Sequence, residues 1–98
     1  MDADTSRIRL AALGHQTRLS VVEALSAAGA TGRLPSDLAD EIGIPRNLLS
    51  AHLLVLDRAG LISTEQRGRN RILRIVPDAL IGLSEHLAEL GLRGRRTD

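Results

Sequence analysis

Apolar residues recur at helical spacing along most of the chain, and glycine follows each such run. The pattern predicts five helices, because apolar residues three or four positions apart share one helix face and glycine commonly ends a helix. The predicted helices, each written up to its closing glycine, cover residues 6–14, 16–29, 35–43, 45–60 and 77–91. In the second of them, Leu19, Val22 and Leu25 form the expected buried face.

The fourth predicted helix is more apolar than a surface helix needs to be. Leu49, Leu53 and Leu56 stand at i, i+4 and i+7, and between residues 48 and 56 only Ser50 and His52 are polar. We therefore expect this helix to be packed on two sides, with its few polar side chains on the face that remains.

A short stretch after residue 60 has the composition of strands. The β-branched runs "LISTEQ" and "RILRIV" flank "RGRN", which predicts a hairpin with a glycine-containing turn. Before it, two short helices separated by a glycine turn have the helix-turn-helix layout. The order is helix, helix, helix, helix, hairpin, helix. We expect one mostly α domain with a small β-hairpin, a winged helix-turn-helix over residues 1–98, with a core at 7–91 and loose ends at 1–5 and 93–98.

The composition narrows the function classes. With 98 residues the chain forms one modest core, and with no Phe, Tyr or Trp it has no stacking platform for single-stranded nucleic acid. The absence of Cys excludes disulfides and thiolate chemistry. No membrane-length apolar run and no signal peptide are visible, so a soluble, cytoplasmic protein is expected.

The net charge of +1 conceals an uneven distribution of arginine. All 13 basic residues are Arg, a side chain suited to bidentate contacts with phosphate and guanine. Four of them fall between residues 67 and 74, on the predicted hairpin, and three between 93 and 96, which we interpret as a solvated tail.

Three stretches resemble the ArsR/SmtB family of bacterial winged-helix transcriptional regulators. They are "LAALGHQTRLSVVEAL", "LADEIGIPRNLLSAHLLVLDRAGLI" and "RGRNRILRI", which together span residues 7 to about 90. The resemblance implies a homodimer joined by the first and last helices. It also implies binding to a palindromic operator, repression of transcription, and release by an inducer that the sequence does not identify.

The chain departs from the metal-sensing members of that family. Their cysteines are absent, and of the ligand pattern on the last helix only His86 and Glu89 remain, with Leu73 and Ile75 at the partner positions. We therefore expect no metal site and no cofactor. A metal site completed across a dimer axis is retained as an alternative. Ala51 and Leu54 also replace polar or basic residues that are usual in the recognition helix.

The start of the fourth helix holds the candidates for reading bases, because this part of the second motif helix points at the major groove. Arg46 is expected to bond guanine, and Asn47 adenine or a phosphate. Ser50 lies on the same side, and Ala51 is placed to meet thymine methyl groups. For His52, packing or a phosphate contact is favoured over metal ligation.

The hairpin holds the candidates for phosphate contact. Arg69 at the tip and Arg71 are expected to bind the DNA backbone, and Arg69 is placed to enter a narrow minor groove. Arg67 and Arg74 are weaker candidates, because successive side chains along a strand point to opposite faces of the sheet. The alternative is a charged edge that prevents strand pairing.

The last helix carries a leucine stripe that a chain of this size has little core to cover. We expect Leu80, Leu83, Leu87 and Leu90 to form a dimer interface, and Ile8 and Ala12 of the first helix to join it.

Together these features predict a DNA-binding transcriptional regulator, a homodimeric repressor that recognises double-stranded DNA at an inverted repeat. The alternatives are a winged helix used for protein contact and a metal-responsive repressor. An enzyme is not expected, because the chain has no Cys, no glycine-rich phosphate loop and no Ser-His-acid set on a nucleophile elbow.

Overall fold

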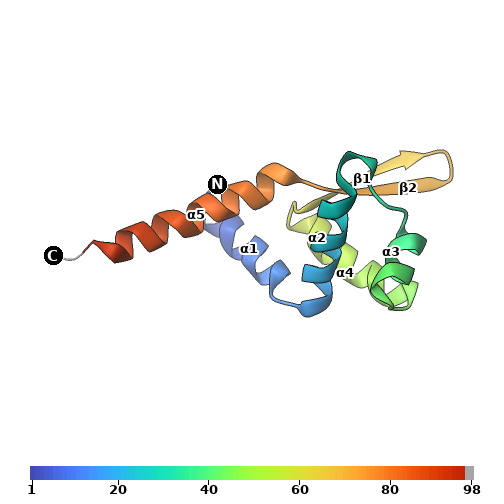
Figure 1. The fold of residues 1–98 in the computed structure, drawn as a ribbon, viewed down its shortest axis with the longest axis horizontal. Coiled ribbons are helices and arrows are strands. Elements are labelled where there is room, and N and C mark those ends of the chain that lie inside the picture. Colours follow the sequence, from blue (N-terminus) through green and yellow to red (C-terminus); the bar gives the residue numbers. More distant parts are fainter. Residues whose placement is uncertain (97–98) are drawn as a thin grey trace.

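The structure, a computed structural model, describes residues 1–96 and has the predicted winged helix-turn-helix fold. Figure 1 shows the long last helix extending from one end of the molecule and the hairpin from the other. The elements in chain order are α1 (Ala3–Leu13), α2 (Gln16–Ala28), the 3-10 turn η1 (Gly29–Thr31), α3 (Pro35–Ile42), α4 (Arg46–Arg58), β1 (Ile62–Arg67), β2 (Asn70–Ile75) and α5 (Pro77–Arg95). None of the helices described is long and apolar enough to cross a membrane.

The core is built from aliphatic side chains alone. Leucines from α2, α3, α4 and β2 meet there, together with residue 61, which precedes β1. The largest wholly buried apolar side chains are Val21, Leu25, Leu38, Leu49, Leu56, Leu61 and Leu73. Because burial of one such side chain stabilises the fold by roughly 1.5–3 kcal/mol, this cluster fixes α4 against α2 and α3.

Helix α4 has one buried side and one exposed side. Leu49, Leu53 and Leu56 are buried, as predicted. Pro45 precedes the helix with extended backbone and lacks the N–H that a helix start would leave unpaired. At the other end, Arg9 of α1 donates from Nε to the carbonyl oxygen of Ala59 at 2.9 Å, which binds a free C-terminal carbonyl.

Each strand of the hairpin lies one residue nearer the tip than the sequence indicated, and the turn is tighter. The ladder runs from the Ile62–Ile75 pair to the Arg67–Asn70 pair, so only Gly68 and Arg69 form the turn. Gly68 has φ of +57°, a left-handed conformation that glycine adopts freely. The expected four-residue turn was therefore wrong by one pair of residues.

An isolated β-bridge on the other edge of β2 was not predicted. Arg33 and Leu73 exchange two backbone hydrogen bonds of 2.9 Å, so β2 lies between β1 and the segment before α3. This bridge joins the hairpin to the helix-turn-helix motif and holds the two at a fixed distance.

Both ends of the chain are more helical than expected. α1 starts at Ala3, where the Asp2 carboxylate accepts a hydrogen bond of 2.7 Å from the backbone N–H of Thr5, and this bond lowers the pKa of Asp2. α5 continues through Gly91 to Arg95, supported by an ion pair between Arg93 and Glu89. Residues 1–5 and 93–95 are thus largely helical, and 97–98 lie outside the described part.

Three apolar residues do not lie where the sequence pattern placed them. Leu19 is 45% exposed, and Val21 is buried in its place. Ala12 and Leu83, both expected at a dimer interface, are 3% and 4% exposed in the single chain. They belong to the interior of the protomer, because α1 and the first half of α5 already pack together.

The junction of α2 and α4 is a pair of histidines. The rings of His15 and His52 lie 4.5 Å apart between centroids, and His15 caps α2 by accepting from the backbone N–H of Thr17 at 3.1 Å. Burial of His52 lowers its pKa, and electrostatic interactions with the neighbouring His15 and Arg18 act in the same direction.

We predict that replacing Gly32 by Ala destabilises the fold more than the same change at Gly43. Both have positive φ, +73° at Gly32 and +83° at Gly43. Gly43, with ψ of +37°, is in the left-handed helical region, where a Cβ costs about 1–2 kcal/mol, whereas Gly32, with ψ of −168°, is in a region essentially restricted to glycine. At Gly32 the new Cβ would also lie 2.6 Å from the Leu73 carbonyl oxygen, whereas at Gly43 nothing lies within 4 Å. Urea unfolding measures both variants, and equal losses would show that the Arg33–Leu73 bridge tolerates displacement.

We predict that stability falls as the pH drops below about 6.5, the ordinary pKa of histidine. Because the pKa of His52 is lower in the folded chain, the unfolded chain takes up the proton first, and acid favours unfolding. The free energy of unfolding should decrease between pH 7.5 and 5, and His52→Gln should reduce that decrease. His86→Gln, a histidine change on α5, is the control. An unchanged pH dependence in His52→Gln would contradict the assignment.

Candidate nucleic-acid interface

The first two turns of α4 present their polar side chains to solvent. Arg46, Asn47, Ser50 and Ala51 are all exposed: Asn47, Ser50 and Ala51 lie away from the buried leucines, and Arg46 is at the open start of the helix. The Ser50 hydroxyl donates to the Arg46 carbonyl oxygen at 3.0 Å, within the helix. Its oxygen lone pairs remain available, so Ser50 can accept a hydrogen bond from a base amino group but donates within its own helix.

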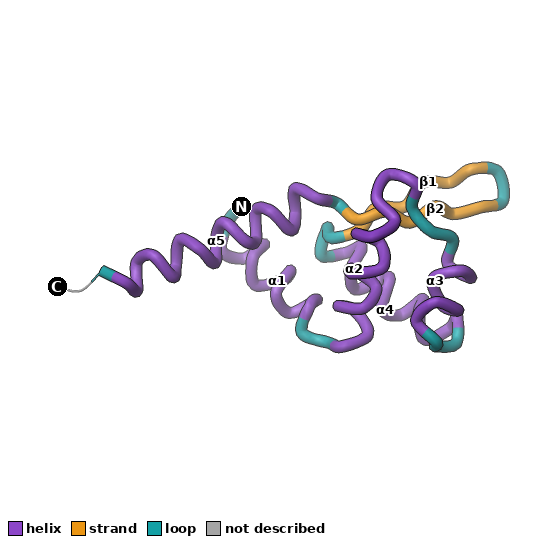
Figure 2. The backbone as a smooth tube through the Cα atoms, in the orientation of Figure 1, coloured by secondary structure: helices purple, strands orange, loops and turns teal. Residues whose placement is uncertain are grey.

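A cavity between α4 and the hairpin brings the predicted arginines together. Arg46, Arg69 and Arg71 line it, in a volume of about 270 Å³. No acidic residue contributes to its wall. Figure 2 shows the hairpin and α3 at the same end of the molecule, with the tip of the hairpin projecting beyond the helices. The cavity therefore joins the recognition helix and the wing in one positively charged surface.

Other lining residues of this cavity were not predicted. They come from the start of α3 and from the hairpin: Leu34, Pro35, Ser36 and Asn70. Sequence reasoning treated Pro35 only as a helix start. α3 is the first helix of the helix-turn-helix motif, and in this motif the first helix crosses the DNA backbone. That position could have indicated the residues at the start of α3.

The four wing arginines divide by their partners. Arg74 donates to Glu65 at 2.7 Å and to the Ala30 carbonyl oxygen at 2.7 Å, while Arg67 donates to Glu65 at 2.9 Å. These two contacts, that of Arg74 first, lower the pKa of Glu65. Within residues 1–96, the side chains of Arg69 and Arg71 form no hydrogen bond and no ion pair.

The partners of the four arginines separate those that stabilise the hairpin from those that are available for DNA. Arg74 binds the hairpin to the loop after α2, so its role is structural. Arg67 is exposed, and it shares the single carboxylate of Glu65 with Arg74, so its charge is only partly neutralised. Arg69 and Arg71 retain their full charge at the tip, which favours these two for contact with phosphates.

His52 lies at the side of this surface. It is half-buried on α4, with its ring against His15 of α2. This position agrees with the packing interpretation of His52.

The last helix offers little for a metal. His86 lies beside Glu85 and Glu89 along a shallow hollow, and Glu89 is engaged by Arg93 at 2.5 Å. Among residues 1–96 no three His, Cys, Asp or Glu side chains gather closely enough to hold a metal ion.

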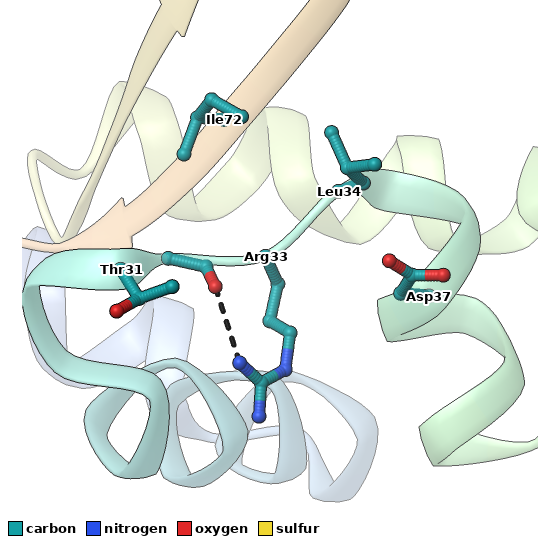
Figure 3. A pocket seen from close by; sticks show the side chains of 6 residues that line it. Thr31, Arg33, Leu34, Asp37 and Ile72 are labelled. Atoms are coloured by element: carbon teal, nitrogen blue, oxygen red, sulfur yellow. Dashed lines mark hydrogen bonds between the residues drawn. The ribbon is translucent and has the colours of Figure 1, made fainter.

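A larger hollow of about 480 Å³ lies on the other side of the hairpin base (Figure 3). Two charged side chains line this hollow. The first, Arg33, already donates hydrogen bonds to the Gly32 carbonyl oxygen at 3.2 Å and to Glu41 at 3.3 Å. Its second charged group, Asp37, would repel a phosphate. The hollow therefore lacks the free positive charge of the smaller cavity.

An exposed apolar surface runs along α5. Leu87 and Leu90 are 44% and 48% exposed, as the predicted leucine stripe requires. Ile81 and Leu92, which the stripe did not include, are 54% and 55% exposed, and Ile8 of α1 is 56% exposed. Leu80 is only half-buried and packs against the core.

Known structures share this fold. An ArsR family transcriptional regulator is 26% identical, covers 99% of this chain and 98% of its own, and has a TM-score of 0.80. An ArsR-like transcriptional regulator from Rhodococcus sp. RHA1 is 24% identical over 92% of this chain and 82% of its own, with a TM-score of 0.80. The homodimeric winged helix-turn-helix DNA-binding domain Mb0332 from Mycobacterium bovis is 23% identical over 97% and 88%, with a TM-score of 0.73.

No curated protein matches the chain in sequence. The family described as helix-turn-helix domain matches residues 13–65, more than half of the chain. The solved structures named above are transcriptional regulators and a DNA-binding domain, which confirms the prediction that the chain is not an enzyme. The chain belongs to this helix-turn-helix family, and it shares its winged helix-turn-helix fold with solved ArsR-type transcriptional regulators.

Proposed function

We propose that the protein is a cytoplasmic homodimeric repressor that binds an inverted-repeat operator in double-stranded DNA. The observation that carries the proposal is the convergence of Arg46, Arg69 and Arg71 on one surface without an acidic partner. Unpaired arginines on a recognition helix and a wing suit a polyanion whose bases and phosphates both lie within reach.

Base reading is assigned to the start of α4. Arg46 and Asn47 are exposed in the first turn, where a recognition helix contacts base edges. The long fork of Arg46 suits guanine O6 and N7, and the Asn47 amide suits adenine N6 and N7. Ser50 and Ala51 lie one turn on and complete the reading surface.

Dimer formation is assigned to α5 and α1. The exposed residues Leu87, Leu90 and Ile8 supply apolar area that a second copy would cover. The Mycobacterium bovis relative is described as homodimeric. A two-fold axis would place two recognition helices in successive major grooves, about 34–36 Å apart, and the operator would then be an inverted repeat.

The test of the proposal is a footprint on the DNA upstream of the protein's own gene, followed by fluorescence anisotropy with the protected duplex. A protected inverted repeat with half-sites about one helical turn apart is the expected result. Binding that does not distinguish this duplex from a scrambled one would contradict sequence-specific recognition.

We predict that Arg46→Ala and Arg69→Ala weaken binding in different ways. Loss of the Arg46 base contact should cost about 1–3 kcal/mol on the operator and little on random DNA. Loss of the Arg69 phosphate contact should weaken both and lower the salt slope by about one per contact, or about two in a symmetric dimer. Affinities for both duplexes at several salt concentrations separate the two effects.

Arg95→Ala is the matched control, because it removes the same charge at the far end of α5 (Figure 1). Loss of discrimination at one A·T-rich position in Arg69→Ala would mean that the wing reads groove width. If neither Arg46→Ala nor Arg69→Ala changed DNA binding, the interaction with protein partners would become the better interpretation.

We predict that Leu87→Glu together with Leu90→Glu produces a folded monomer. Both side chains are exposed in the protomer, so the charges should disturb the contact between copies and leave the core intact. Leu83 is unsuitable for this test, since its burial would make a charge there unfold the chain.

Light scattering measures the mass of this double variant, and circular dichroism measures its helix content. Leu48→Glu is the control, because Leu48 is 53% exposed in the first turn of α4, on a different surface. A double variant that keeps the mass of a dimer would place the contact between copies elsewhere.

A further inference from the structure

Two arginines face a cavity far from the wing. Arg18 of α2 and Arg58 of α4 line a hollow of about 320 Å³, at the opposite end of α4 from Arg46. The rest of its wall is apolar and comes from α1 and α4, with Ile8, Ala11 and Val55 as the side chains at its surface. Neither the hairpin nor the reading surface of α4 contributes to it.

Arg18 lacks a partner for a buried donor. Its Nε is shielded from solvent and has no hydrogen-bond acceptor. Within residues 1–96, neither Arg18 nor Arg58 forms an ion pair with a carboxylate, although five other arginines do. A buried N–H donor without an acceptor is unfavourable, and because Arg18 as a whole is only partly buried, its guanidinium is accessible to an anion in the hollow.

We propose that this cavity binds a small amphipathic carboxylate, with the carboxylate on Arg18 and an apolar body against α1 and α4. A planar guanidinium matches a carboxylate with two parallel hydrogen bonds. The apolar wall excludes a bare inorganic anion as the best ligand, because that wall would remain in contact with water. The volume lies at the lower end of the range for small-molecule sites.

The position of the cavity gives such a ligand a route to DNA affinity. Its wall includes Ala59, whose carbonyl oxygen accepts the hydrogen bond from Arg9 of α1. A ligand there would contact both α1, which we assign to the dimer interface, and α4, the proposed recognition helix. Binding itself does not depend on the proposed DNA-binding function, and the experiment below measures it without DNA.

The probe is 3-phenylpropionate, observed by NMR. The chain contains no Phe, Tyr or Trp, so ring-current shifts of its methyl groups report the ring of the probe against an aromatic-free background. We expect saturable shifts at the methyl groups of Ile8 and Val55, with a dissociation constant of roughly a millimolar or below for a ligand of this size.

Controls separate the charge from the cavity. The neutral analogue 3-phenylpropanol and the variant Arg18→Gln should each bind about tenfold more weakly, because a charge-assisted hydrogen bond is lost. Ala11→Leu, which adds volume at the exposed wall, should abolish the shifts without altering Arg18. Arg95→Gln should leave binding unchanged.

Absence of saturable shifts, equal affinity for the alcohol, or full binding by Ala11→Leu would each overturn the proposal. Ile8 is also a predicted dimer-interface residue, so the dimer itself provides a further test. Intermolecular NMR contacts from a second copy to both Ile8 and Val55, with no probe binding, would show that the partner fills the cavity instead.

Discussion

The fold depends on the burial of one side of α4 by leucine. Leu49, Leu53 and Leu56 are nearly inaccessible to solvent and pack in a core that has no aromatic side chain. Aliphatic side chains pack closely between helices, so the rotation of α4 about its own axis is fixed. That rotation decides which residues remain outside, and they include Asn47, Ser50 and Ala51, while Arg46 is exposed at the start of the helix. The proposed reading surface is therefore largely a consequence of the packing of the opposite side.

The arginines of the chain serve two physical purposes. Some are held by acceptors and fix the fold: Arg9 at the end of α4, Arg33 beside α3, and Arg74 beneath the hairpin. Others have no side-chain acceptor within the described residues, and apart from Arg95 and Arg96 at the end of α5 they gather in two places. One group faces the cavity at the wing, and the other the cavity between α1, α2 and α4. Unpaired charge at defined sites points to ligands in a way that net charge does not.

The sequence predicted the elements and their order because helical and strand periods differ clearly here. It did not predict the end of α5, since Gly91 ends a helix only where tertiary structure or a following turn supports it. Nor could a period of 3.6 decide between Leu19 and Val21, because on the helical wheel they flank Val22 and Leu25 on opposite sides, and only the packing of α2 buries Val21 and leaves Leu19 exposed. The bridge between Arg33 and Leu73 joins residues forty positions apart, and no local pattern encodes it.

The candidate site was also predictable only in part, because local spacing and tertiary contacts each determine some of it. Exposure of Asn47 follows from the leucine spacing, whereas Arg46, at i−3 from Leu49, is exposed because it begins the helix. The difference between Arg69 and Arg74 depends on Glu65 and Ala30, which only the folded hairpin brings near. Burial of Ala12 and Leu83 also depends on the packing of α1 on α5. A stripe of leucines cannot by itself show which of its members the protomer already covers.

The most direct test of the central claim is the backbone amide NMR spectrum of the protein during titration with double-stranded DNA. The account predicts that chemical shifts change at residues 46–51 and 68–71, and that those in the last two turns of α5 stay constant. Changes confined to α5, or none at 46–51, would contradict the claim that the packing of α4 creates a DNA-reading surface.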